Sequence, residues 1–283
     1  MKKSLGWIMV FLLCIGILSG CQEKTSSTSE QTIKVGIRTS ELRTWEFIKS
    51  KAKEEGLNID IVTFTAAVDP NQALSEGDID VNAFQHVAYL NTFNEKNHTD
   101  IVPIGTTIIA PLGLYSNKYK DLKQLPNGAK IAVPNDQSNW GRALVLLQEA
   151  NLLTVVDDFD GNGGEDKIKK NAKNLEIIPV DSATTPRVME DVDASIINNG
   201  VAVEAGLGLK DALVHESKTA KPYINVIAAR KEDQNNETYK KLVHLYQSDE
   251  VANYIEKTFN GNYLPTFIPL KELKISMKEE DGL

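Results

Sequence analysis

The stretch KIAVPNDQSNWGRALVLLQEA, residues 130–150, decides the fold. Its first residues, Lys130–Val133, form a short apolar run that is typical of a buried strand. Its last residues, Trp140–Ala150, place their apolar side chains on one side of a predicted helix. A strand that passes through a short polar loop into an amphipathic helix is the repeating unit of α/β proteins.

The same alternation of apolar strands and amphipathic helices runs through the chain from Ile33 onwards. Further strands are predicted over Ile33–Ile37, Ile59–Phe64, Ile79–Asn82, Ile101–Ile104, Leu175–Ile178, Ala194–Ile197 and Ile224–Ala229. Further helices are predicted near Thr44–Glu55, Gln85–Phe93, Thr184–Glu190, Gly200–Leu207, Glu237–Gln247 and Asp249–Thr258. This alternation favours an α/β fold with largely parallel sheets. About 250 residues are enough for two medium cores, so we expect two α/β lobes rather than one oversized sheet.

The N-terminal residues predict export and a lipid anchor. A lysine pair precedes the apolar run Leu5 to Leu18, which is short for a membrane span, and Leu18-Ser19-Gly20-Cys21 ends it as a lipobox. The pattern resembles that of bacterial lipoproteins, so residues 1–20 are predicted to be a signal peptide and Cys21 the lipidated N-terminus. Residues 21–32 are then the lipidated cysteine and a polar, flexible tether. We expect a protein held by lipid on the extracytoplasmic face of the cell membrane.

Composition limits the partners and the chemistry. The formal net charge is −8, and removal of the signal peptide with Lys2 and Lys3 leaves 29 basic and 39 acidic residues, or −10. An acidic chain without basic clusters argues against a nucleic-acid partner. The two cysteines are Cys14, inside the signal peptide, and Cys21, so we expect neither a disulfide nor a reactive thiol in the folded part.

The sequence lacks the motifs of common enzymes. It has no Gly-x-Ser-x-Gly elbow and no phosphate-binding glycine loop. None of its histidines lies in a recognisable acid–base setting. They are His86, His98, His215 and His244. We therefore predict a protein that is not an enzyme and takes no cofactor.

One segment superficially matches a metal site. Asp158–Gly163 has the spacing that begins a calcium-binding loop, but position twelve of that loop is Lys169, where a bidentate glutamate is needed. The segment is therefore predicted to be a surface turn without a metal ion.

Two segments suit a small ligand. Asn135–Arg142 follows a strand and opens a helix, whose first N–H groups and dipole attract anions. Arg142 in the first turn, on a face other than the buried one, adds a bidentate donor for a carboxylate, although a solvated or ion-paired arginine is the common alternative. Phe84–Tyr89 supplies aromatic surface after a strand, and core packing is the reading that these residues alone favour.

Seven stretches, in order along the chain, resemble the methionine-binding lipoproteins of the NlpA type, which are extracellular receptors for amino-acid ABC importers. They are Asp80–Leu90, Pro111–Ser116, Ile131–Asp136, Gly141–Leu144, Asp191–Asn198, Pro222–Asn225 and Tyr246–Val251. Together they span nearly the whole mature domain in the family's order, which makes the resemblance far more specific than any single motif.

The resemblance implies a type II periplasmic-binding-protein fold, with two α/β lobes and the ligand in the cleft between them. The lobes would comprise residues 33–112 plus 226–283 and residues 113–225, joined near 111–115 and 223–226. It also implies an ABC importer permease with its ATPase as partners, and we expect a monomer.

The resemblance further implies the ligand residues. Arg142 would bind the carboxylate of an amino acid, and Asn198 and Asn225 would bind its head group. Phe84, His86 and Tyr89 would enclose the side chain. These residue types fit an α-amino acid, which needs an anion site, acceptors for its ammonium group and an apolar slot.

Three departures from the family concern the side-chain end of the site. Ala67 stands where the family has a pocket tyrosine, and Ala88 stands where it has a proline. Arg38–Arg43 replaces the family's Gly-Pro turn after the first strand. The ligand is therefore expected to be an amino acid, either methionine or a related one, or a short methionine-containing peptide. An adhesin or scaffold that kept the fold is a further alternative, against which the retained Arg142 and Asn198 count.

Overall fold

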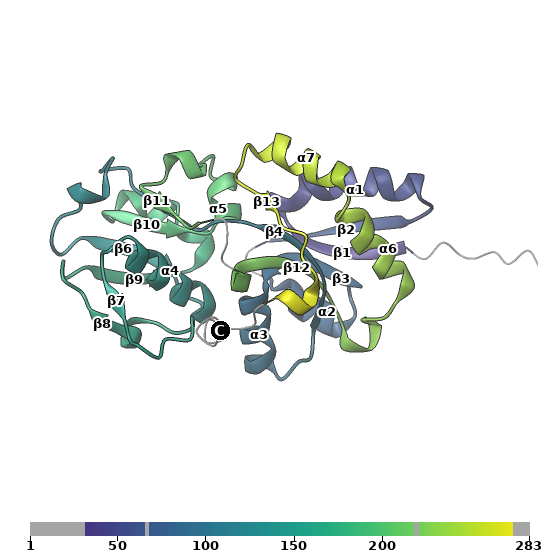
Figure 1. Cartoon of the computed structure of the whole chain (residues 1–283), viewed down its shortest axis with the longest axis horizontal. Helices are drawn as coiled ribbons and strands as arrows, with labels where there is room; N and C mark the ends of the chain where they lie inside the picture. The colour runs from purple at the N-terminus through teal and green to yellow at the C-terminus, as the bar shows by residue number, and fades with distance from the viewer. Residues whose placement is uncertain (1–31, 66–67, 218–220, 274–283) are drawn as a thin grey trace, which may run out of the picture.

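The computed structural model describes residues 32–65, 68–217 and 221–273, and these form two lobes that lie side by side (Figure 1). Lobe 1 is built on a six-stranded sheet in the order β13-β4-β12-β3-β1-β2. Its strands are β1 (Thr32–Arg38), β2 (Asn58–Phe64), β3 (Val81–His86), β4 (Val102–Ile109), β12 (Ile224–Ala229) and β13 (Leu264–Pro265). Its helices are α1 (Leu42–Glu54), α2 (Pro70–Glu76), α3 (Val87–Asn97), α6 (Glu237–Tyr246) and α7 (Asp249–Phe259).

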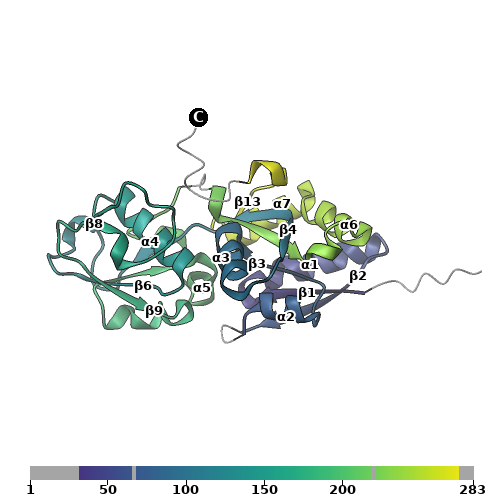
Figure 2. The ribbon, with the colours of Figure 1, turned by 90° about the horizontal axis from the view of Figure 1, so that it is seen from below.

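Lobe 2 is built on a five-stranded sheet in the order β11-β5-β10-β6-β9. Its strands are β5 (Gly113–Tyr115), β6 (Lys130–Pro134), β9 (Glu176–Val180), β10 (Ala194–Ile197) and β11 (Val214–His215). Its helices are α4 (Gln137–Glu149) and α5 (Asn199–Glu204), and a small ribbon pairs β7 (Thr154–Val155) with β8 (Ile168–Lys170). Figure 2 shows the same two bodies from below.

The core of lobe 1 lies on both faces of its sheet. On one face Trp45 of α1 packs with Tyr246 of α6 and Ile255 of α7. On the other face Leu74 of α2 packs with Leu90 of α3. The core of lobe 2 joins its sheet to α4, whose Ala143, Leu144, Leu146 and Leu147 are fully buried as the sequence predicts.

The two-lobed α/β architecture is confirmed, but the prediction of largely parallel sheets is wrong. Strands β2, β1 and β3 run parallel, as do β9, β6 and β10. Strands β12, β4 and β13 of lobe 1 and β5 and β11 of lobe 2 pair antiparallel. In lobe 1 the reversed strands are β12 and β13, which come after the chain has returned from lobe 2. In lobe 2 the reversed strand is β5, the first one after the chain has entered that lobe.

Three predicted elements differ locally. The helix predicted from Gln85 begins at Val87, because β3 continues to His86. The helix predicted over Thr184–Glu190 is instead two 3₁₀ turns, Ser182–Thr184 and Arg187–Glu190, with Pro186 between them. A proline lacks the N–H that a continuous helix would use there. The helix predicted to end at Leu207 ends at Glu204.

The chain passes from lobe 1 to lobe 2 between Ile109 and Gly113, and it returns between His215 and Ile224. Within the described ranges, no helix is long and apolar enough to cross a membrane.

Candidate functional site

The predicted ligand residues gather where the lobes meet, at the carboxyl ends of parallel strands. Strand β3 ends at His86, and β6 and β10 end just before Asp136 and Asn198. Open α/β sheets bind ligands beyond the carboxyl ends of their strands. Here the two lobes touch directly, because Nε2 of His86 lies 3.2 Å from Oδ1 of Asn139 in α4.

Arg142 is buried and ion-paired, which corrects the expectation that it lies on an exposed face. Its side chain is 3 % exposed and that of Glu216 is 6 % exposed. Nε and Nη2 of Arg142 donate to Oε1 and Oε2 of Glu216 at 2.7 and 2.5 Å. The ion-paired alternative is therefore realised, and the bidentate partner is a residue of the protein.

The remaining contacts of Arg142 fix its guanidinium plane. Nη2 also donates to the carbonyl oxygen of Ala110 at 3.0 Å, and the guanidinium carbon lies 4.4 Å from the ring centre of Tyr223. Ala110 and Tyr223 belong to the two segments that connect the lobes. The third guanidinium nitrogen, Nη1, forms no hydrogen bond with any described residue. Its N–H groups can therefore donate to an acceptor on a ligand.

His86 is a neutral donor in this site. Its Nδ1 accepts from the backbone N–H of Tyr89 at 3.0 Å, so the proton lies on Nε2, which donates to Asn139. Burial, with the charge of Arg142 as a second cause, lowers the pKa of His86 to about 3. The ring also packs edge-on against Tyr223, with 5.3 Å between ring centres.

Asn139 is a central residue that sequence reasoning missed. Its Oδ1 accepts from His86 and, at 2.7 Å, from Nδ2 of Asn198. Its Nδ2 donates to both carboxylate oxygens of Asp136 at 3.0 Å, and Asp136 also caps α4. Asn139 and Arg142 are three residues apart and so share one face of α4. The signal was present in the segment quoted above, as a polar residue one turn before the arginine.

The side-chain oxygen of Asn198 lacks a hydrogen-bond donor. Oδ1 of Asn198 is buried and accepts no hydrogen bond from the described residues. A buried acceptor left unpaired costs free energy, and a ligand donor would remove that cost. Asn225 lies on β12 directly opposite His86 of β3 and is half-buried, so it borders the same cluster.

The aromatic residues lie beside these polar groups on lobe 1. The rings of Phe84 and Tyr89 meet edge to face, with 5.9 Å between their centres. The hydroxyl of Tyr89 donates to Oδ2 of Asp69 at 2.7 Å, and Asp69 caps α2. Both rings are only partly buried, so they are not simple core residues. Asp69 was not predicted as part of the site.

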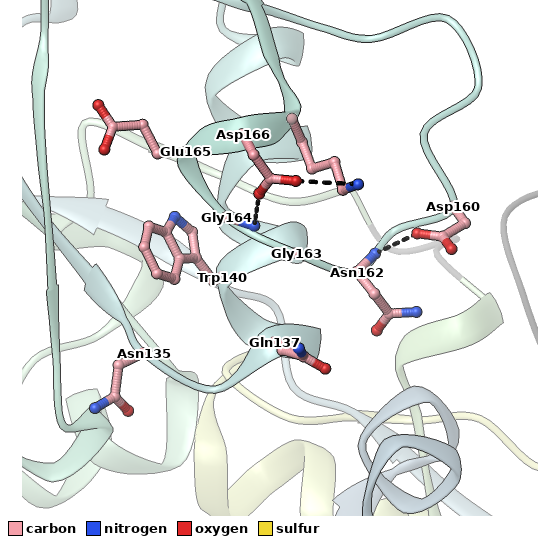
Figure 3. A pocket seen from close by; sticks show the side chains of 10 residues that line it. Asn135, Gln137, Trp140, Asp160, Asn162, Gly163, Gly164, Glu165 and Asp166 are labelled. Atoms are coloured by element: carbon pink, nitrogen blue, oxygen red, sulfur yellow. Dashed lines mark hydrogen bonds and ion pairs between the residues drawn. The ribbon is translucent and has the colours of Figure 1, made fainter. Parts of the chain in front are cut away.

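A separate cavity of about 530 Å³ lies beside the start of α4 and contains none of the predicted ligand residues. Figure 3 shows it between Trp140 and the loop that carries Asp160, Glu165 and Asp166. Its complete lining is Asn135, Gln137, Trp140, Asp160, Asn162, Gly163, Gly164, Glu165, Asp166 and Lys167. The segment predicted as a turn forms this wall, where Asp160 accepts from the N–H of Asn162 at 3.0 Å.

Two predicted positions lie outside the described residues. They are Cys21, with the signal peptide and tether around it, and Ala67. The ends of the gap at Ala67 are Thr65 and Val68, whose carbonyl oxygens both accept from Nη1 of Arg38.

Comparisons with known proteins agree on one family. The family model described as NlpA lipoprotein matches residues 33–267. The D-methionine-binding lipoprotein MetQ of Salmonella typhi is 39% identical over 249 residues, 86% of this chain and 91% of that protein. An uncharacterized lipoprotein of Bacillus subtilis, YhcJ, is 35% identical over 96% of this chain and 97% of its own length.

A solved structure supports the same assignment. A nutrient-binding protein from Burkholderia cenocepacia, bound to methionine, is 44% identical, with a TM-score of 0.80 over 83% of this chain and all of that one. The Salmonella and Burkholderia proteins are named as binding proteins. With a match that spans residues 33–267, this chain belongs to the NlpA lipoprotein family.

Proposed function

We propose that this protein is a lipid-anchored receptor that binds an amino acid between its lobes and delivers it to an ABC importer. The observation that carries the proposal is the unpaired, buried Oδ1 of Asn198, whose Nδ2 donates to Asn139, one turn before Arg142 on the same face of α4. Among the described residues Nη1 of Arg142 donates to no acceptor. An acceptor and a cationic donor match the ammonium and carboxylate groups of an amino acid.

In this proposal the head group is held mainly by lobe 2, with Asn225 of lobe 1, and the side chain is held by lobe 1. Nη1 of Arg142 binds the carboxylate, Oδ1 of Asn198 accepts from the ammonium, and Asn225 completes the polar contacts. Phe84, His86 and Tyr89 enclose the side chain. The neutral state of His86 suits this role, because a second cation beside Arg142 would repel the ammonium group.

The lobes would act as a clamp that signals the bound state. Hydrogen bonds already join them: the N–H of Ser40 donates to Glu204 at 2.8 Å, and Asn199 donates to the carbonyl of Asn262 at 2.8 Å. Closure over the ligand would present both lobes to a permease and its ATPase. We propose a monomer that is not an enzyme. The predicted lobes, residues 33–112 plus 226–283 and 113–225, change by two residues at the second boundary, because β12 begins at Ile224 and belongs to the sheet of lobe 1.

Ala67 favours a second candidate ligand, a short methionine-containing peptide. An alanine in place of a tyrosine removes a ring from the site, and a larger ligand would fill that volume. The head-group contacts proposed above are the same for both candidates.

A ligand panel tests the function and the choice of ligand. We expect L-methionine to raise the melting temperature of residues 22–283 less than another amino acid or a short peptide does. A ligand at about one hundred times its dissociation constant adds about 2.7 kcal/mol to the free energy of unfolding, which a thermal-shift screen resolves. Ala67→Tyr should then move the preference towards methionine. Tightest binding of methionine by the unmodified chain would contradict the argument from Ala67, and no response to any amino acid or peptide would contradict the proposed function.

The lipid anchor has its own test. Cys21→Ala should yield an unlipidated protein that no longer partitions with membranes, because the thiol that carries the acyl chains is gone. Metabolic labelling with a radioactive fatty acid, followed by phase separation in detergent, measures this directly. Equal labelling of the wild type and the variant would rule out lipidation at Cys21.

A further inference from the structure

We infer that Arg38 is a specificity-determining residue that binds a neutral acceptor oxygen at the far end of the ligand. The inference rests on the proposed function, because it assumes that the ligand lies between the lobes with its distal end against Phe84 and Tyr89. It limits the candidate ligands to compounds that carry a sulfoxide, amide or peptide carbonyl oxygen at that end.

The sheet topology places Arg38 at the site. It is the last residue of β1, and β1 lies between β2 and β3 in the parallel part of the lobe 1 sheet. The register pairs Gly36 with Asn82, so Arg38 comes level with Phe84, two residues further along both strands. Arg38 therefore projects from the same carboxyl edge that carries His86.

The guanidinium of Arg38 covers the aromatic wall. Its carbon lies 5.2 Å from the ring centre of Phe84, within the range of a cation–π contact. Nη1 donates to the carbonyl oxygen of Thr65 and, at 2.9 Å, to that of Val68. Nε and Nη2 donate to no described residue, although the side chain is half-buried. Two partly desolvated donors at the end of an apolar slot favour an oxygen acceptor over a thioether.

The charges around Arg38 decide that the acceptor is neutral. Its acidic neighbours are Asp69 in lobe 1 and Asp181 and Glu204 in lobe 2. In the described part of the structure these carboxylates accept from other residues, Asp69 from Tyr89, Asp181 from Ala183 and Glu204 from Ser40, and none forms an ion pair with Arg38. They nevertheless balance its charge, and an anionic ligand group would be repelled by them. A dipolar oxygen accepts the two hydrogen bonds without that repulsion.

The competing explanation is that Arg38 only anchors the segment from Thr65 to Val68. An anchoring residue would affect all ligands alike, whereas a residue that contacts the distal oxygen would affect only ligands that have one. The difference between these ligands is therefore the quantity to measure.

The test compares ligands that differ by a single oxygen. Dissociation constants of L-methionine, L-methionine sulfoxide and the two dipeptides of methionine and glycine are measured by calorimetry on the full chain without its lipid. We expect the wild type to bind the sulfoxide or one dipeptide at least about tenfold more tightly than methionine. The ligand with the lowest dissociation constant shows whether the bound oxygen belongs to a side chain or to a peptide bond.

The matched variants are Arg38→Met and Arg43→Met. Arg43 also stacks on a ring, that of Phe259 at 4.8 Å, but on the opposite side of the lobe 1 sheet. Arg38→Met should lose the preference for the oxygen-bearing ligand and keep or improve methionine binding, and Arg43→Met should bind as the wild type does. Arg38→Gln serves as a second variant if Arg38→Met does not fold.

Two results would overturn the inference. One is a wild type that binds methionine as tightly as the oxygen-bearing ligands, and the other is an Arg38 variant that keeps the full preference. In both cases methionine still binds, and the proposed receptor function stands. A wild type that binds none of these ligands refutes the proposed function instead, and the inference with it.

Discussion

Arg142→Ala is expected to abolish amino-acid binding and also to lower the free energy of unfolding of the empty protein by about 3–5 kcal/mol. The second effect follows from Glu216, whose carboxylate is buried and accepts two hydrogen bonds from Arg142. Without the arginine, one donor to that charge remains among the described residues, the backbone N–H of Leu112 at 2.8 Å. An uncompensated buried charge is far more costly than the net worth of the intact pair.

Two measurements separate the effects of Arg142→Ala. Urea unfolding of the ligand-free protein reports stability, and calorimetry with the best ligand of the panel reports affinity. The double variant Arg142→Met/Glu216→Met is the control, because removing both charges should restore most of the stability without restoring binding. Wild-type stability in Arg142→Ala would contradict the ion pair, and wild-type affinity would contradict the carboxylate contact.

The ion pair between Arg142 and Glu216 contacts both segments that connect the lobes, so binding at Arg142 could affect the movement of the lobes. Arg142 contacts Ala110 and Tyr223, and Glu216 contacts Leu112. Ala110 and Leu112 belong to the outgoing connection, and Tyr223 belongs to the returning one. In the proposed complex, a ligand carboxylate on Nη1 would therefore bind a guanidinium group that already contacts both segments about which the lobes would move.

The sequence predicted the elements whose periodicity is clear and missed those that long-range packing defines. The helix after Asn139 was predicted because its apolar residues recur on one side. The burial of Arg142 was not, because its partner Glu216 is 74 residues away and no local pattern connects them. Charge alone places an arginine at the surface, and only the fold supplies the carboxylate that allows burial.

Among the predicted ligand residues, too, some could be identified from the sequence and others only from the fold. Arg142, Asn198 and the aromatic residues were identified through the resemblance, and the structure brings their elements together between the lobes. Asn139 and Asp69 were missed because each acts through another side chain, Asn139 through His86 and Asp69 through Tyr89. Such partners become visible only when the fold brings together the elements that carry them.

A second large effect is expected at Glu41, which lies outside the ligand site. Glu41 ends the 3₁₀ turn Thr39–Glu41 after β1 and is 6 % exposed. Burial raises the pKa of its carboxyl from 4.5 to about 8, and the charge of Glu204 in lobe 2 adds to the rise. Folded Glu41 thus keeps a proton that it loses on unfolding at neutral pH. Its contribution to stability is complete below about pH 4.5 and is lost as the pH rises through 8.

Glu41→Gln should therefore stabilise the protein, and the gain should grow with pH. Glutamine keeps the shape of the neutral acid and has no proton to lose, so the variant escapes a loss of roughly 1–2 kcal/mol that the wild type suffers between pH 6.5 and 8. Urea unfolding across this window measures the difference. The window avoids His86, whose lowered pKa of about 3 reduces stability only as the pH falls below about 6.5. Glu46→Gln, at an exposed position of α1, is the control and should leave the pH profile unchanged. Parallel profiles of the wild type and Glu41→Gln would show that Glu41 is already ionised in the folded protein, because only a carboxyl that takes up a proton on folding can produce the slope.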